Sequence, residues 1–232
     1  MEFDRMLAYC AALEAHNERS WFHENHKWYE EAREDFLSLL EHLRFAIADA
    51  APAVSRDILY MPAKSWMYRI ARDMRYYRDM PPYKPSFRAY ISPDKKSPLP
   101  LGYFLQLKPG DSLLGTGLFC DSTKEMNRIR DFILRHWDEL EAILLENGLT
   151  VEGDRLKTMP RGYDAAHPAA DILRCKNWTV VFPLEESCLT DYESFARHAS
   201  ELVRRMEPSR CFLLAAATGV SDENDELLRF YR

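Results

Sequence analysis

The stretch FRAYISPDKKSPLPLGYFLQLKPGDSLLGTGLF, from Phe87 to Phe119, decides the fold class. Its short runs are rich in aromatic and β-branched residues and are divided by Pro, Gly, Ser and Asp, which is typical of strands separated by turns. Pro and Gly supply the backbone angles that chain reversals need, so SPDKKSPLPLG and KPGD are predicted turns. With one similar run upstream, the pattern predicts an antiparallel meander of strands at Trp66–Ala71, Phe87–Ser92, Tyr103–Lys108 and Leu113–Phe119.

Upstream of this meander the apolar spacing is helical. Apolar residues from Phe3 to Leu13 recur at intervals of three and four, which predicts a short amphipathic helix. A second apolar stripe begins after Asn25, a residue type suited to cap a helix N-terminus, and predicts a long helix that ends before Pro52.

Downstream, two capping boxes mark the starts of helices. STKE at 122–125 precedes an apolar stripe that predicts a helix ended by Gly148. TDYE at 190–193 opens a second helix, with Thr as the capping residue, that Pro208 is expected to stop. One more strand, Trp178–Phe182, brings the predicted sheet to about five strands. Helices, then strands, then helices make the fold class α+β.

Length and composition favour one soluble domain. A chain of 232 residues with 47% hydrophobic and 29% charged residues can bury one sizeable core, so we predict a single domain over residues 1–232. The five cysteines are widely spaced and form no CxxC pair, which favours neither a disulfide framework nor a zinc site. The N-terminus does not resemble a signal peptide, and no apolar run is long enough to span a membrane. We therefore expect a cytoplasmic protein with no membrane contact.

The segment RIARDMRYYRDMPPYK, at 69–84, concentrates positive charge in a chain whose net charge is −6. Cations this close repel one another unless carboxylates or a bound anion offset them, and guanidinium groups suit phosphate or carboxylate. The first hypothesis is therefore a site for a small phosphate- or carboxylate-bearing ligand. Its predicted residues are Arg69, Arg72, Arg75 and Lys84, with Trp21 and Tyr83 as candidates for stacking or a hydroxyl contact.

A hydrolase or transferase at such a site would need a base, and the sequence does not decide whether the protein is an enzyme. The two candidate bases are His167 and Asp73. His167 precedes Pro168, which restricts it to extended backbone and suits a fixed loop position. The structural alternative for His167 is to cap the short helix that follows this proline.

Two other functions fit the same basic segment. Its arginines could instead form internal ion pairs with acids such as those of the helix at 25–49, in a non-enzymatic protein-interaction module. The tyrosines interleaved with them also suit base stacking, as in single-stranded nucleic-acid binding. The sequence pI of about 5.7 argues against a large nucleic-acid interface.

Other motifs carry weaker signals. Gly115 and Gly117 within a predicted strand favour a β-bulge over close approach of a ligand. The chain has no P-loop and no GxGxxG, so no cofactor is predicted. His23 and His26 are three residues apart and could face a metal, but no third ligand stands at a readable spacing, so no metal site is predicted.

Four blocks of the chain resemble a known family. They are NERSWFHENHKWYEEA at 17–32, RIARDMRYYRDMPPYK at 69–84, GYFLQLKPGDSLLGTGLF at 102–119 and LKTMPRGYDAAHPAADILRCKNWTV at 156–180. In this order they resemble the conserved bacterial and fungal proteins catalogued as domain of unknown function 2461. Met80 and Pro81 stand where that family usually has Lys and Thr, and Thr116 where it usually has Gly. The resemblance implies a single-domain α+β protein and brings no established activity.

Overall fold

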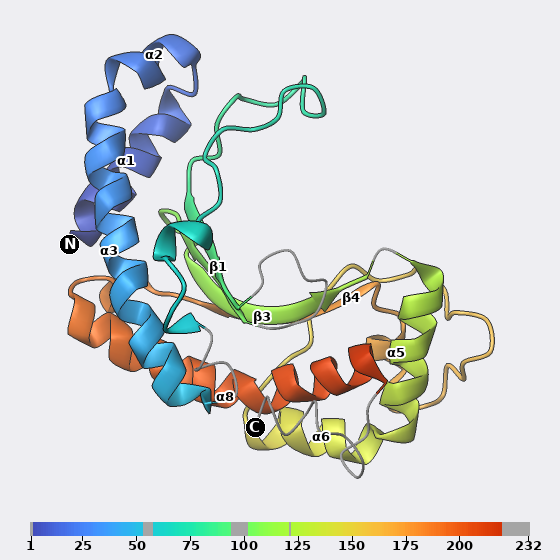
Figure 1. Ribbon diagram of the computed structural model, residues 1–232. Helices are drawn as coiled ribbons and strands as arrows, with labels where there is room; N and C mark the ends of the chain where they lie inside the picture. Colours follow the sequence, from blue (N-terminus) through green and yellow to red (C-terminus); the bar gives the residue numbers. More distant parts are fainter. Residues whose placement is uncertain (1, 53–57, 94–101, 121, 220–232) are drawn as a thin grey trace.

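A computed structural model describes residues 2–52, 58–93, 102–120 and 122–219. The helices are α1 (Phe3–Ala15), α2 (Arg19–Glu24), α3 (His26–Ala50), α5 (Thr123–Arg135), α6 (Trp137–Glu146), α7 (Ala170–Leu173) and α8 (Tyr192–Thr218), with short 3₁₀ turns η1 (Ala63–Ser65) and η2 (Glu186–Cys188). The strands are β1 (Phe87–Ile91), β2 (Tyr103–Leu107), β3 (Leu113–Phe119) and β4 (Asn177–Pro183). The predicted α+β class is confirmed (Figure 1).

The described strands form one antiparallel sheet in the order β1-β2-β3-β4. Residues of β1 and β2 alternate between buried and half-buried, as expected when one sheet face is covered. Figure 1 shows α8 below the curved sheet, with α3 crossing beyond β1, and these helices cover the buried face. On the other face Arg88 lies opposite Gln106, and Tyr90 opposite Phe104.

The predicted first strand, Trp66–Ala71, is wrong as a regular strand, so the sheet has four strands rather than about five. The segment runs beside β1, but only isolated bridges join it to its partner, Met67 to Ala89 and Ala71 to Tyr83. Trp66 and Ile70 of this segment are buried, and the indole Nε1 of Trp66 donates to Ser92 O at 2.9 Å. Burial of single side chains, rather than a continuous ladder, therefore holds this edge.

The predicted bulge in β3 is also wrong. The β3–β4 register runs without interruption from Leu113 opposite Pro183 to Phe119 opposite Asn177. The glycines serve close strand approach instead, because a Cβ on Gly117 would lie 2.6 Å from Trp178 O. A side chain there would push β4 away from the sheet.

The capping box at 122–125 is confirmed. Ser122 Oγ accepts from Glu125 N at 3.2 Å and donates to the Glu125 carboxylate at 2.9 Å. The predicted single helix is divided, however, because His136 leaves helical geometry with φ −119° and ψ 32° between α5 and α6. Gly148 then follows the end of α6 with a positive φ of 60°.

The last helix differs from its prediction at both ends. Asp191, not Thr190, caps α8, and its carboxylate accepts from Ser194 N at 2.9 Å. The helix also continues through Pro208 to Thr218 instead of stopping there. A proline costs one backbone hydrogen bond, but buried side chains on both sides of it, including Met206 and Phe212, pack under the sheet and outweigh that loss.

Beneath the sheet, α8 carries a buried ionic network. Arg210 donates to the two carboxylate oxygens of Glu207 at 2.6 and 2.8 Å, and Tyr103 OH donates to Glu207 at 2.5 Å. Burial alone would lower the pKa of Arg210, but the hydrogen bonds and charge of Glu207 raise it overall. Burial, then the charge of Glu207, raises the pKa of Tyr103. This arginine is thus fully engaged within its own chain.

Candidate anion-binding site

Residues 66–90 fold back on themselves beside the sheet, and we call them the edge hairpin. Its two arms are joined by backbone hydrogen bonds of 2.8 to 3.0 Å. The donor and acceptor pairs are Tyr90 with Trp66, Tyr68 with Arg88, Lys84 with Ile70, and Arg72 with Pro82. Figure 1 shows the two arms rising together from the β1 side of the sheet into a projecting turn.

A side chain outside the hairpin anchors its base. Asn17, in the connection between α1 and α2, accepts from Tyr83 N at 3.0 Å and donates to Tyr83 O at 3.1 Å. This amide pairs with the backbone as a neighbouring strand would, so it fixes the second arm against the helices. The Tyr83 ring stacks on Phe22 with centroids 4.2 Å apart and is buried.

Arg72 clamps the two arms together. Its Nη1 donates to Pro81 O at 2.8 Å and to Tyr83 O. Both acceptors are backbone carbonyls, and among the described residues no carboxylate lies within salt-bridge distance of Arg72. Its positive charge is therefore not neutralised by this part of the chain.

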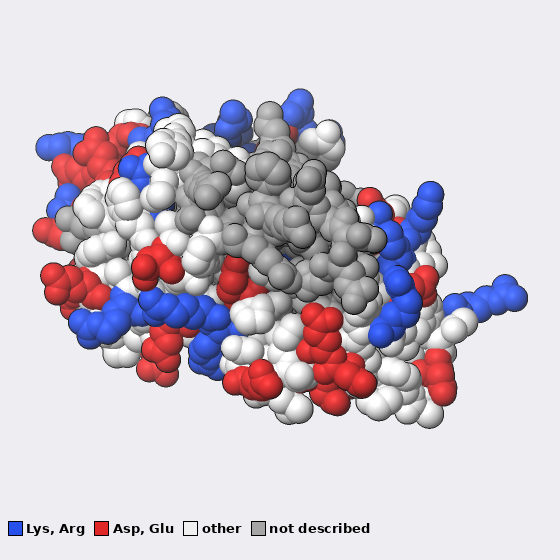
Figure 2. Space-filling view, turned by 60° about the horizontal axis from the view of Figure 1, so that its bottom comes forward, with Lys and Arg blue, Asp and Glu red and all other residues white. Residues whose placement is uncertain are grey.

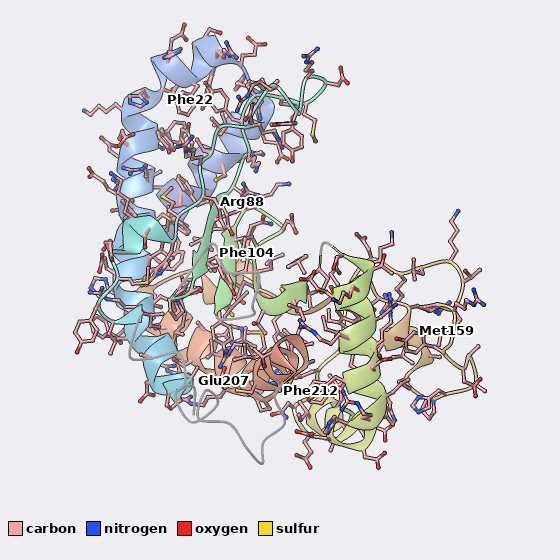
Figure 3. All side chains as sticks on the ribbon, turned by 45° about the vertical axis from the view of Figure 1, so that its right-hand side comes forward. Phe22, Arg88, Phe104, Met159, Glu207 and Phe212 are labelled. Carbon is pink, nitrogen blue, oxygen red and sulfur yellow. The ribbon has the colours of Figure 1, made fainter. Side chains whose placement is uncertain are left out.

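Arg88 is the second residue of β1, four residues after Lys84, and lies on the sheet face opposite α8. Its side chain is half-buried, and its guanidinium carbon lies 5.8 Å from the centroid of the Tyr68 ring. The buried Nε has no acceptor among the described residues. In Figure 3 Arg88 lies next to Phe104, whose ring is 6.2 Å from that of Tyr68. A guanidinium is thus placed among aromatic rings with hydrogen-bonding capacity unused.

Lys84 completes the group, and we call Arg72, Lys84 and Arg88 the cation cluster. Burial, followed by the charges of Arg88 and Arg72, lowers the pKa of Lys84. Burial is also the largest cause that lowers the pKa of Arg88, and Arg72 adds to it while Tyr68 opposes it. The three cations therefore act on one another, and no described carboxylate offsets them.

A comparison with known protein families gives one match. The sequence profile of a family described as "Conserved hypothetical protein (DUF2461)" matches residues 5–212. The chain belongs to the DUF2461 family. No curated protein and no solved structure matches it. The match covers the cation cluster and nearly all of the fold, and the family description names no activity.

The other predicted cations of this DUF2461 protein are placed differently. Arg75 forms a bidentate pair with Asp73, with Nη2 to Oδ2 at 2.6 Å and Nε to Oδ1 at 2.9 Å. Hydrogen bonds from the side chain and then the backbone of Arg75 lower the pKa of Asp73 and make it a poor base. Arg69 and Arg78 are exposed and lie in no ion pair with a described residue.

The predicted aromatic residues face inward rather than toward the cation cluster. The Trp21 ring lies 5.9 Å from His16, 6.0 Å from Tyr9 and 6.4 Å from Trp28. Tyr83, as described above, stacks on Phe22, and only its backbone meets Arg72. The aromatic ring that lies over the cation cluster is Tyr68.

His167 lies in a different part of the DUF2461 fold. Its Nδ1 accepts from Ala169 N at 3.1 Å just before α7, and its ring lies 6.1 Å from Trp137 at the start of α6. With His136 it lines a hollow of about 340 Å³ at the junction of α5 and α6, whereas the edge hairpin adjoins β1. The sequence prediction that His167 and the arginines could share a site is therefore not met by their positions.

No metal site was predicted from the sequence, and this expectation stays a prediction. In the described ranges, no three His, Cys, Asp or Glu side chains gather closely enough to hold a metal ion. His26 lies 3.9 Å from Glu30, and His23 is exposed. The helices that the structure describes include none with the length and apolar character of a membrane span.

Sequence reasoning missed Arg88. The residue stands outside the basic motif, in FRAYI, where alternate positions are buried. An arginine at an interior position of a strand, four residues after a lysine on the same arm, was the available signal. Its meaning depended on Arg72 lying across the hairpin, which spacing along the chain does not show.

Proposed function

We propose that this protein binds a small anionic ligand, phosphate- or carboxylate-bearing, at the cation cluster. The observation that supports the proposal is the buried Arg88 Nε without an acceptor, beside two more cations with no described carboxylate in reach. An unpaired buried charge costs stability, so its retention favours a partner from outside the chain. Arg88 and Lys84 supply charge-assisted donors, and Tyr68 lines the site.

The ion-pair alternative has less support. The acids of the long helix are engaged elsewhere: Asp35 lies 3.3 Å from Arg5, Glu41 2.9 Å from Arg44, and Asp49 3.1 Å from Arg204. In the described parts of the edge hairpin, the one arginine that pairs with a carboxylate is Arg75.

Nucleic acid is a weaker candidate for the anion. Figure 2 shows Lys and Arg intermixed with Asp and Glu over the face toward α6 and α8, which is the side away from the cation cluster, so no continuous basic path extends over that side outside the grey atoms. The cation cluster is local and suits a single anionic group. Binding of a single-stranded oligonucleotide would have to weaken steeply with added salt to support this alternative.

Thermal unfolding in a panel of anions tests the proposal. Phosphate, sulfate, phosphate monoesters and small carboxylates are each added, and a ligand at about a hundred times its dissociation constant stabilises the protein by roughly 2.7 kcal/mol. Arg88→Gln should abolish the shift. Arg75→Gln removes the same charge from the same hairpin and should leave it unchanged. If no anion shifts the wild-type midpoint, or both variants respond like the wild type, the proposal is wrong.

A further inference from the structure

The environment of Lys84 differs from that of the other lysines that the structure describes. Lys27 lies 3.9 Å from Glu31 with a side chain 93% exposed, and Lys108 lies 3.2 Å from Glu14. Lys64, Lys124, Lys157 and Lys176 are exposed. Lys84 is half-buried and has no described carboxylate or hydrogen-bond acceptor at its Nζ. Its charged neighbours are Arg72 from the opposite arm and Arg88 from β1.

This arrangement makes proton loss from Lys84 easier than from an exposed lysine. A half-buried ammonium group near two guanidiniums gains no counter-charge from them and loses hydration, while the arginines cannot release their protons in the accessible pH range. Lys84 is the member of the cluster that can relieve the repulsion by losing a proton. The lowered pKa of Lys84, caused first by burial and then by the two arginines, agrees with this reasoning. At a given pH, a lysine with a lowered pKa therefore holds a larger fraction of neutral, nucleophilic amine than an exposed lysine does.

We propose that Lys84 forms an imine with small carbonyl compounds that carry one negative charge, of the 2-oxo carboxylate class. The inference rests on the proposed function, because the same two arginines would hold the carboxylate group. In a 2-oxo acid the carbonyl carbon is bonded directly to the carboxylate carbon. Capture of the carboxylate by Arg72 and Arg88 therefore presents the carbonyl to the neighbouring amine of Lys84 and raises its effective concentration there.

The reaction needs no oxidant, reductant or metal. The Nζ lone pair attacks the carbonyl carbon, the carbonyl oxygen takes up a proton, and the resulting carbinolamine loses water as the C=N bond forms. One negative charge on the ligand offsets only one of the two guanidinium charges. The net charge beside Nζ stays positive, so the pKa of Lys84 remains lowered when the ligand is bound.

Reductive trapping on the full chain tests this inference. The protein is treated with glyoxylate and sodium cyanoborohydride, which converts an imine into a stable carboxymethyl amine, and peptides are read by mass spectrometry. Lys84 should be labelled about tenfold faster than the exposed Lys27, because the carboxylate is captured beside it. Inorganic phosphate should slow labelling at Lys84 alone. Equal rates at the two lysines, with no effect of phosphate, would overturn the proposal.

Variants separate selective chemistry from simple exposure. Arg88→Gln should bring the Lys84 rate close to that of Lys27 and move its pH dependence toward higher pH, whereas Arg75→Gln should change neither. Acetaldehyde, which lacks the carboxylate, should lose most of the preference for Lys84. Equal preference for Lys84 with acetaldehyde and glyoxylate would contradict capture by the arginines.

The outcomes also distinguish the two proposals. Lys84→Arg keeps the charge and removes the nucleophile, so it should retain the anion-induced thermal shift and lose the label at position 84. An Arg88-dependent shift in the wild type without selective labelling keeps the anion site and rejects the imine. Absence of both the shift and the selective label rejects both proposals.

Discussion

Two arginines of this protein, Arg210 and Arg88, lie on opposite faces of the same sheet and differ in whether a carboxylate of the described chain pairs with them. Arg210 is almost fully buried and receives a complete bidentate partner in Glu207, which also accepts from Tyr103. Arg88 is half-buried and faces Tyr68, with a buried Nε and two cationic neighbours instead of a carboxylate. In Figure 3 Glu207 lies below the strands that carry Arg88 and Phe104.

The contrast separates structural charge from charge that remains available. A buried guanidinium that serves the fold is satisfied by its own chain, because an unpaired one is costly. A guanidinium that the chain leaves incomplete can be satisfied by a ligand. The number of cations in a segment does not reveal this difference, since Arg75 belongs to the basic motif and is already paired with Asp73.

The largest effect on stability is expected at the buried Arg210–Glu207 pair. Glu207→Ala leaves the Arg210 charge buried without its carboxylate and should lower the free energy of unfolding by about 3–5 kcal/mol. Urea denaturation measures this loss. Glu201→Ala, at an exposed position of the same helix, serves as the control and should stay within about 0.5 kcal/mol of the wild type. Equal stability of the two variants would show that the buried network contributes no more to the free energy of unfolding than an exposed side chain does.

The second expected effect is at Arg88, where a substitution should reduce anion affinity without reducing stability. Arg88→Met replaces an unpaired, half-buried charge by an apolar chain of similar reach, so stability should be unchanged or higher by about 1 kcal/mol. Affinity for the best anion should fall about 10- to 100-fold, since a charge-assisted hydrogen bond contributes roughly 1.5–3 kcal/mol. Calorimetric titration and urea denaturation measure the two quantities. A large loss of stability with unchanged affinity would make Arg88 structural, like Arg210.

A pH dependence sharpens the contrast further. The folded-state pKa of Lys84 is lowered, so below it the folded protein holds an ammonium that the unfolded chain accommodates better. This unfavourable contribution is relieved as pH rises through the folded pKa toward the model-peptide value of about 10.4. Lys84→Met should therefore be more stable than the wild type at neutral pH, with a difference that shrinks as pH rises. A difference that grows with pH would mean that Lys84 has a stabilising partner.

The smallest effect is expected at the exposed pair in the hairpin turn. Arg75→Ala removes the ion pair with Asp73. The Arg75 side chain is 82% exposed, and such surface pairs contribute about 0–1 kcal/mol to stability. The unfolding midpoint should barely move, and anion affinity should stay at the wild-type value. A loss of affinity here comparable to that of Arg88→Met would extend the binding site into the turn.

Much of the fold could be predicted from local patterns. The strands at Phe87, Tyr103, Leu113 and Trp178 and the Ser122 cap were found because alternation and capping chemistry act within a few residues. The predictions that failed depended on contacts with residues far away in the sequence. Pro208 stops an isolated helix, but packing under the sheet carries α8 through it, and the glycines of β3 are explained by the neighbouring backbone of β4.

The candidate site shows the same division. Arg72 and Lys84 were proposed from the sequence because they belong to a dense basic motif, while Arg88 was not named because its proximity to them depends on the way the hairpin folds back. Arg75 was included in error as an equal member of that set, since a carboxylate two residues away already engages it in the structure. Charge density is readable along the chain, and charge compensation is a property of three dimensions.

The hydrogen bonds that Arg72 and Asn17 make to the second arm of the edge hairpin have a consequence for proteolysis. Arg75 and Arg78 are exposed in the projecting turn and present sites for trypsin, while Arg72 and Asn17 hold the arms below it through the backbone at 81–83. A single cut in the turn would divide the polypeptide without releasing either piece. The nicked protein should elute at its intact size under native conditions and separate into two fragments only in denaturant.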